Sequence, residues 1–257
     1  MTAGSNMSFW EHLEALRSVL LRVAAAWLVC AVAAFVFKDA LFSAVFAPAQ
    51  ADFVFYRLLG KIGISTENID IHFINTELSA QFTMHVKVAA WVGLLLSFPL
   101  IVYLVYGFVS PALYARERRY AVRAFCAGAG LFFMGVAVNY YMVFPLTVRF
   151  LAGYQVSGAV ENMISLSSYV GTLLTLSLCM GVVFELPAVS FLLGSMGLLS
   201  AGMMRRYRRH AIVAIATVAA VITPTTDAFT LLVVSLPIYA LYEVSILTVP
   251  SSRKASC

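Results

Sequence analysis

Residues 88–115 read VAAWVGLLLSFPLIVYLVYGFVSPALYA, a run of 28 residues without one charged side chain. A helix of about 20 apolar residues crosses the roughly 30 Å hydrocarbon core of a bilayer, so this run is long enough to span a membrane. Reading outward from charge to charge gives five further apolar runs. The sequence therefore predicts an all-α integral membrane protein, a single polytopic domain over 1–257, with six transmembrane helices at about 18–37, 79–109, 120–147, 165–193, 210–223 and 228–248.

The overall composition supports a membrane protein and excludes several other classes. Of the 257 residues, 62% are hydrophobic and 11% are charged, whereas a soluble domain has about 25% charged residues. The four cysteines and four histidines lack the spacing of a metal or redox site, and no nucleotide loop or nucleophile motif is present. We therefore expect no enzymatic activity, no metal and no cofactor.

The positions of the 17 Lys and Arg residues predict the orientation in the membrane. Basic residues gather near the cytoplasmic ends of spans, and 12 of the 17 lie on one side of the six predicted helices. Both termini are therefore expected in the cytoplasm, and the net charge of +5 is a topology signal rather than a nucleic-acid footprint. The 12 residues are Arg17, Arg22, Arg116, Arg118, Arg119, Arg123, Arg205, Arg206, Arg208, Arg209, Arg253 and Lys254.

A short amphipathic helix is expected before the first span, at about 6–17. Ser8 and Glu11 have the spacing of a capping box, and Trp10 and Leu13 contribute to an apolar stripe. Such a helix lies on the membrane surface. The first outer segment, about 38–78, is the longest connection and is expected to form a partly ordered cap.

Glu185 lies inside the fourth predicted span, in the sequence Phe184-Glu185-Leu186-Pro187. A carboxyl group in hydrocarbon is costly and needs a partner or a wet cavity, while Pro187 removes a backbone donor and tends to kink the helix. The two together predict a functional polar site. The alternative is a hydrogen bond that only holds two helices together.

Glu243, in the sixth predicted span, is a second acid within the membrane. Counted from the span ends at about 1.5 Å per residue, Glu185 and Glu243 lie at similar depths and could share one cavity. Alternatively, the Glu243 side chain snorkels to the membrane interface.

Two further segments differ from ordinary spans and loops. The fifth predicted span has about 14 residues, which is short of the hydrocarbon thickness, and short spans thin the bilayer or recruit partners. Glu117 stands among arginines in the loop between the second and third spans. From spacing alone, that run of charges is more typical of a solvated cytoplasmic loop than of a binding site.

Several motifs resemble the TatC subunit of the twin-arginine protein translocase over nearly the whole chain. HLEALR at 12–17 is similar to the family's HLEELR pattern, and FVSPALY at 108–114, followed by Glu117-Arg118-Arg119, is similar to its first cytoplasmic loop. Phe144-Pro145, the FELP motif at 184–187, the Thr-Pro turn that ends at Asp227, and Leu236-Pro237 with Glu243 follow in the family's order. Pro48 and Lys87 also fall where the family has such residues.

The resemblance implies a cupped six-helix receptor in the bacterial inner membrane that binds signal peptides carrying paired arginines. With TatA- and TatB-type single-span partners, in a hetero-oligomer of several copies, it would export folded proteins by means of the proton-motive force. Glu117 would meet the twin arginines, Glu185 would be the polar site of the concave face, and spans five and six would dock the partners. Carried over in the same way are Glu14, Arg17, Arg118 and Arg119 beside Glu117, and the structural positions Pro48, Pro111, Pro187, Pro224 and Asp227.

The chain also departs from the family pattern at three points. Ala15 replaces the second of two adjacent acids, so its part in arginine recognition is vacant or passes to Glu14 or Glu11. The turn at 223–227 reads TPTTD where paired prolines are common, and Leu231 stands where glutamine is common. Partner docking near this turn is therefore expected to differ in detail.

Two other functions would use some of the same residues. A proton-coupled secondary transporter could use Glu185 and Glu243 as a relay, but no internal repeat of the kind such transporters contain is visible. An intramembrane enzyme would need a nucleophile and base pair, which the sequence lacks.

Overall fold

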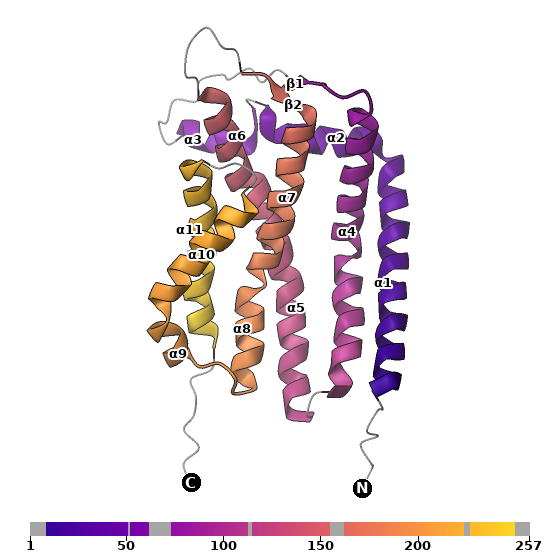
Figure 1. Ribbon diagram of the computed structural model, residues 1–257, viewed down its shortest axis with the longest axis vertical. Coiled ribbons are helices and arrows are strands. Elements are labelled where there is room, and N and C mark those ends of the chain that lie inside the picture. The colour runs from indigo at the N-terminus through magenta and orange to yellow at the C-terminus, as the bar shows by residue number, and fades with distance from the viewer. Residues whose placement is uncertain are drawn as a thin grey trace.

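The computed structural model describes residues 9–50, 52–61, 73–112, 115–154, 162–223 and 227–249. Within these ranges the chain is almost wholly helical, as predicted, and the long helices run side by side (Figure 1). The helical elements are α1 Phe9–Val36, α2 Lys38–Phe46, η1 Ala47–Ala49, α3 Val54–Lys61, α4 Ala80–Val109, η2 Ser110–Ala112, α5 Ala115–Val138, η3 Asn139–Val143, α6 Phe144–Gly153, α7 Leu166–Phe184, α8 Leu186–Ser195, α9 Ala201–Arg206, α10 Arg208–Ile222 and α11 Ala228–Thr248.

Five helical stretches in the described part of the chain are long and apolar enough to cross a membrane. They are Leu13–Val36, Ala80–Val109, Arg118–Gly153, Leu166–Ser195 and Ala228–Thr248. The multi-pass helical class is therefore confirmed. The fifth predicted span falls on α10, whose 15 residues extend over about 22 Å at 1.5 Å per residue. Its crossing of the membrane stays a prediction.

The expected boundary between an amphipathic helix and a first span does not appear as a break in the chain. Helix α1 runs without interruption over 28 residues, from Phe9 to Val36. Its first residues carry charges and its later ones are apolar. One continuous helix can join a surface segment to a span because no proline or glycine intervenes.

The third and fourth spans are each built from two helices joined end to end. Between α5 and α6 lies a π-helical segment, η3, where the buried Asn139 donates through Nδ2 to Ser177 Oγ on α7 at 2.8 Å. Between α7 and α8 the Glu185 amide donates to the Val182 carbonyl at 3.1 Å. This bond is one residue tighter than in an α-helix, and Pro187 then lies in the first turn of α8.

The core lies around α7, at the centre of the bundle. Fully buried side chains on α7 and α11, among them Leu176, Met180 and Ile238, pack with Val143 and Phe144 of the α5–α6 junction. Two short parallel strands, β1 Phe73–Ile74 and β2 Ile164–Ser165, pair just before α7. They join the segment just before α4 to the segment just before α7.

Helices α2 and α3 lie across one end of the bundle, opposite the end where α1 begins (Figure 1). The hydroxyl of Tyr56, a buried residue of α3, shares its one hydrogen between the backbone oxygens of Pro48 at 3.2 Å and Pro145 at 3.1 Å. Burial raises the pKa of Tyr56 to about 12. Tyr169 of α7 likewise donates to the Val45 carbonyl at 3.0 Å. The cap is therefore fixed to the bundle by tyrosine hydroxyls.

Helices α1 and α4 approach each other so closely that their backbones meet. A Cβ at Gly93 of α4 would lie 2.5–2.7 Å from the backbone and Cβ of Ala31 on α1. One turn nearer the start of α4, the Trp27 indole nitrogen donates to the Ala90 carbonyl at 2.8 Å. Small residues at such an interface let two helices gain van der Waals contact within a bilayer.

Gly93→Ala is expected to lower the free energy of unfolding by about 1–3 kcal/mol, as overpacking does elsewhere. The added methyl group would overlap a backbone, which has little freedom to move aside. Thermal unfolding of the purified protein in one detergent measures the effect.

Gly107→Ala is the matched control, because it lies in the same helix and a Cβ there meets nothing within 4 Å. That variant should be unchanged or more stable by up to about 1 kcal/mol, from the better helix propensity of alanine. Equal melting temperatures for the two variants would contradict the tight α1–α4 contact.

Candidate functional site

The residues predicted to bind a signal peptide fall at one end of the bundle. Glu14 and Arg17 are exposed near the beginning of α1, and Arg118 and Arg119 are exposed in the first turns of α5. These two helix ends lie at the same end of the molecule (Figure 1). Glu117 belongs to the first turn of α5, but its side chain lies outside the described part of the structure.

The α4–α5 connection at this end is short and begins with a single turn of 3-10 helix. Ser110, Pro111 and Ala112 form the turn η2, in which Ser110 is buried and Pro111 is exposed. The Arg118 Nε donates to the Tyr106 hydroxyl at 3.4 Å. The Tyr106 ring packs edge-on against the Phe125 ring, with 5.5 Å between the ring centres. These contacts join the start of α5 to the end of α4. They hold the backbone that carries Glu117.

Glu185 faces a cavity of about 270 Å³ between α4, α5 and α8. The other residues that line this cavity are apolar, among them Phe98 and Val105 on α4, Phe125 on α5 and Leu192 on α8. The carboxyl group is half-buried, at the junction between α7 and α8. A single acid in an apolar cavity suits a hydrogen-bonding partner that arrives from outside the chain.

Gly128 of α5 makes room for the Glu185 carboxyl group. A Cβ at this buried glycine would overlap the Glu185 Oε2 atom and lie 3.3 Å from its Cδ. The absence of a side chain at 128 therefore sets the position of the acid. No local sequence pattern predicts this pairing, because the two residues lie in different helical segments.

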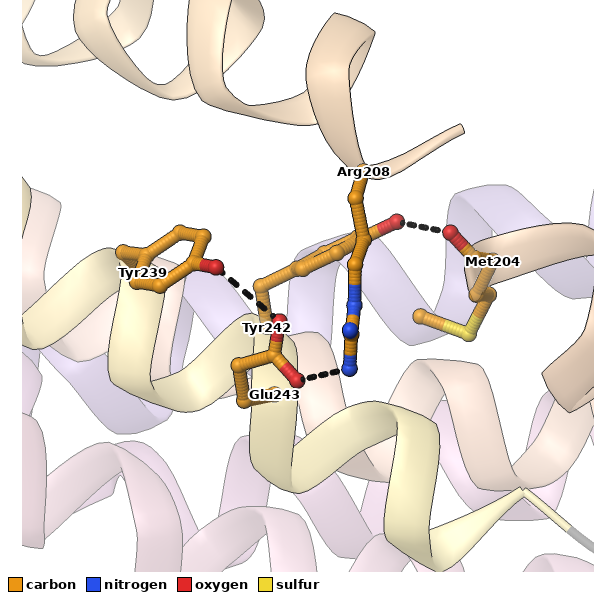
Figure 2. Close-up of polar contacts among 5 residues, drawn as sticks. All are labelled: Met204, Arg208, Tyr239, Tyr242 and Glu243. Carbon is orange, nitrogen blue, oxygen red and sulfur yellow. Dashed lines mark hydrogen bonds and ion pairs between the residues drawn. The ribbon is translucent and has the colours of Figure 1, made fainter. Parts of the chain in front are cut away.

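Glu243 does not line the Glu185 cavity and has its own partners. Its carboxylate accepts from Arg208 Nη2 at 2.6 Å and from the Tyr239 hydroxyl at 3.1 Å (Figure 2). The preceding residue, Tyr242, donates to the Met204 carbonyl at 2.7 Å. These contacts join α11 to α9 and α10, so Glu243 holds helices together.

The remaining predicted positions lie at turns and helix ends. Asp227 caps α11, where its Oδ1 accepts from the Thr230 amide at 2.6 Å. Pro48 is buried in η1, and Pro187 lies in the first turn of α8. Pro224 lies outside the described residues.

The structure adds residues that the sequence had not indicated. Arg208 was assigned only to the basic cytoplasmic cluster, and its pairing with Glu243, 35 residues away, has no local signal. Tyr239 is four residues before Glu243, the spacing of neighbours on a helix face, and could have been found. Among the described residues, no three His, Cys, Asp or Glu side chains come together as a metal site.

Comparison with known proteins gives consistent similarities. The family model described as "Sec-independent protein translocase protein (TatC)" matches residues 11–237. The chain is 35% identical over 240 residues to the Sec-independent protein translocase protein TatC of Koribacter versatilis (strain Ellin345), covering 93% of this chain and 84% of that one. It is 31% identical over 254 residues to the protein of the same name from Blattabacterium sp. subsp. Periplaneta americana (strain BPLAN), covering 94% of each.

The fold is similar to a solved structure as well. A crystal structure of the twin arginine translocase receptor TatC superposes with a TM-score of 0.74 at 27% identity, over 93% of this chain and 97% of that one. The similarity therefore extends over the long helices and the cap together.

Gly128→Ala is expected to turn the Glu185 carboxyl group away from α5 and into the cavity. A hydrophobic carbodiimide should then modify Glu185 faster than in the unaltered protein, as followed by mass spectrometry. Because the flexible end of a side chain can move aside, and alanine favours a helix by up to about 1 kcal/mol, stability should hardly change.

Gly130→Ala serves as the control, since a Cβ there meets nothing within 4 Å. It should leave the rate of modification unchanged. Identical rates in both variants would mean that Gly128 does not set the position of the acid.

Proposed function

This chain belongs to the TatC family of Sec-independent protein translocase proteins, and from that membership we propose that it is the signal-peptide receptor and core subunit of a twin-arginine translocase. As a family member it is a multi-pass membrane component of a protein translocase and not an enzyme. The observation that carries the proposal is the likeness, over 93% of the chain, to a solved twin arginine translocase receptor. The substrates would be folded proteins with twin-arginine signal peptides.

The proposed topology is a cup of six spans in the bacterial inner membrane, with both termini in the cytoplasm. The beginning of α1 and the end of α11 lie at the same end of the bundle, which an even number of crossings requires (Figure 1). In the sequence, 12 of the 17 Lys and Arg residues fall in segments assigned to this side of the membrane, as the positive-inside tendency predicts. Helix α10 would be the short fifth span, and the first turns of α1 would lie on the membrane surface.

Recognition of the signal peptide would rest on Glu117. A guanidinium group is always charged and pairs with a carboxylate through two parallel hydrogen bonds, which an ammonium group does not match. The neighbouring Arg118 and Arg119 would repel cations in general, so a cation would bind only where the acid offers a pair of hydrogen bonds, and this geometry favours arginine. Glu14 and Arg17, exposed at the same end of the bundle, would complete the surface.

Partner subunits would bind at α10 and α11. Helix α10 exposes large apolar side chains along much of its length, including Ile212, Val213 and Val221. Single-span TatA- and TatB-type helices offer a matching apolar surface, and a short span favours association with partners. Transport by this complex would use the proton-motive force.

A proton-coupled transporter is less well supported. Its relay would need Glu185 and Glu243 to face a common path, but Glu243 is paired with Arg208 and does not line the cavity of Glu185. The receptor proposal needs no such path.

Glu117→Ala is expected to abolish most crosslinking of the purified protein to a signal peptide that begins with an Arg-Arg pair. The loss should be at least about tenfold, because a charge-assisted hydrogen bond contributes roughly 1.5–3 kcal/mol. The measurement is the yield of photocrosslinking to a labelled synthetic peptide.

A Lys-Lys peptide gives the control for specificity. It should crosslink poorly to the unaltered protein and be little affected by Glu117→Ala. If the variant crosslinks to the Arg-Arg peptide as well as the unaltered protein does, Glu117 is not the arginine receptor.

For Glu185, a glutamine substitution should preserve export better than a leucine substitution. Glutamine retains a hydrogen-bonding end of similar size, and leucine places only apolar atoms at this junction. Export of a twin-arginine reporter protein from cells that produce each variant gives the comparison. Equal export defects would show that hydrogen bonding is not what the site requires.

A further inference from the structure

Helix α3, in the cap, has one face against the bundle and an apolar face opposite to it. Tyr56 is buried, whereas Val54 and Leu58 each have 53% of their surface exposed. At 3.6 residues per turn, both lie about 160° around the helix from Tyr56. None of the functions proposed above uses this exposed apolar face.

The contacts of Tyr56 show that α3 packs against the side of α6 rather than over its end. The Tyr56 hydroxyl lies 3.1 Å from the Pro145 carbonyl oxygen, and the Arg149 Cζ lies 5.6 Å from the centre of the Tyr56 ring. Pro145 and Arg149 are about one turn apart along α6. Because Tyr56 contacts two successive turns of α6, the opposite face of α3 is directed sideways, away from the bundle (Figure 1).

The span formed by α5, η3 and α6 gives the depth of this contact in a bilayer. Arg123 is the last charged residue before the charge-free run at 124–148. At 1.5 Å per residue, Tyr141 lies about 27 Å and Pro145 about 33 Å beyond Arg123. The hydrocarbon core is roughly 30 Å thick. Helix α3, bonded to Pro145, therefore lies at the level where acyl chains meet headgroups.

The exposed face of α3 continues a surface that faces lipid. Tyr141 and Met142, within the candidate span Arg118–Gly153, are 51% and 45% exposed. The Tyr141 ring stacks on Phe53, the residue just before α3, with 5.8 Å between the ring centres. Tyrosine is enriched at membrane interfaces, where its ring is apolar and its hydroxyl meets water. This ring stack joins the side of the span to the beginning of α3.

The basic residues of α3 lie beside its apolar pair. Arg57 and Lys61 are exposed, and Arg57 forms an ion pair with Asp52. A lysine side chain can place its stem along an apolar surface while its ammonium group reaches the headgroups. Apolar residues on one face with basic residues beside them are typical of a helix that lies in the plane of the membrane interface.

We propose that α3 is an interfacial helix, whose Val54 and Leu58 insert among the acyl chains of the adjacent leaflet while Lys61 reaches the phosphate groups. The partner is a phospholipid surface, because lipid surrounds the side of a span at this depth. Through Tyr56, the lipid contact would hold the whole cap at a fixed depth. The proposal does not rest on the receptor role or on any partner subunit.

The test uses the full chain in nanodiscs of dioleoyl phosphatidylcholine, with a nitrobenzoxadiazole fluorophore on Leu58→Cys and the four native cysteines replaced by alanine. Quenchers are phospholipids that carry a nitroxide either near the headgroup or near the end of the acyl chain. The shallow nitroxide should quench the fluorophore at least about twofold more than the deep one, as expected for a helix at the headgroup boundary. Iodide in the buffer should quench it less than it quenches the free fluorophore.

Two further labelled positions provide matched controls. Val54→Cys should give the same depth as Leu58→Cys, because the two side chains lie on one face of a helix parallel to the membrane. Leu96→Cys, near the middle of α4 and 61% exposed, should be quenched more by the deep nitroxide. Thermal unfolding of each labelled protein against the unaltered chain shows that it is folded.

Three results would overturn the proposal. Strong quenching by iodide with little quenching by either nitroxide would place the face in water. Weak quenching by all three would show that protein covers it, for example a second copy of the chain. Different depths at positions 54 and 58 would show that α3 does not lie in the membrane plane.

A measurement on the unaltered protein avoids any effect of substitution or label. A phospholipid with a photoreactive diazirine near its headgroup is incorporated into the nanodiscs, and adducts are located by mass spectrometry after illumination. Val54 and Leu58 should carry adducts, as should Tyr141 and Met142 on the side of the span. Adducts at the span without any on α3 would contradict the lipid contact.

Discussion

The need to pair every backbone amide and carbonyl group within hydrocarbon governs this structure. Lipid offers no hydrogen bonds, so a chain that crosses a bilayer must satisfy its backbone internally, and helices do so. The places where the regular pattern fails are therefore the informative ones. At η3 the buried Asn139 meets Ser177 of the neighbouring α7, and at the α7–α8 junction a tighter bond forms beside Glu185. Each irregularity has a side that packs within the protein: Asn139 and Val143 are buried in η3, and Pro187 is buried beside Glu185.

The two acids within the helices show two ways of offsetting the free-energy cost of a carboxyl group in hydrocarbon. Glu243 forms an ion pair with Arg208 and accepts a hydrogen bond from Tyr239, and the ion pair joins α11 to α10. Glu185 has only apolar neighbours in its cavity and a glycine that makes room for it. The first arrangement explains why a short α10 can remain attached to the bundle. The second leaves a hydrogen-bonding group available to a ligand, which agrees with the proposed role in a translocase.

Charge organises the proposed functions as strongly as apolarity organises the fold. The same positive-inside bias that would orient the helices also places Arg118 and Arg119 around the proposed peptide site. At the start of α5 an acid stands among these arginines, and in the proposed receptor this acid would select a guanidinium group.

Much of this protein could be predicted from the sequence alone, because apolar length, charge placement and proline positions act locally. Five membrane-length helices, the interruption at Glu185-Leu186-Pro187 and the family itself follow from such local signals. The pairing of Arg208 with Glu243, the space that Gly128 leaves for Glu185, and the contact of Gly93 with Ala31 do not. Each depends on which faces of distant helices meet. Helical periodicity predicts that one face of a helix has apolar or small residues, but only tertiary packing decides which residues lie opposite that face.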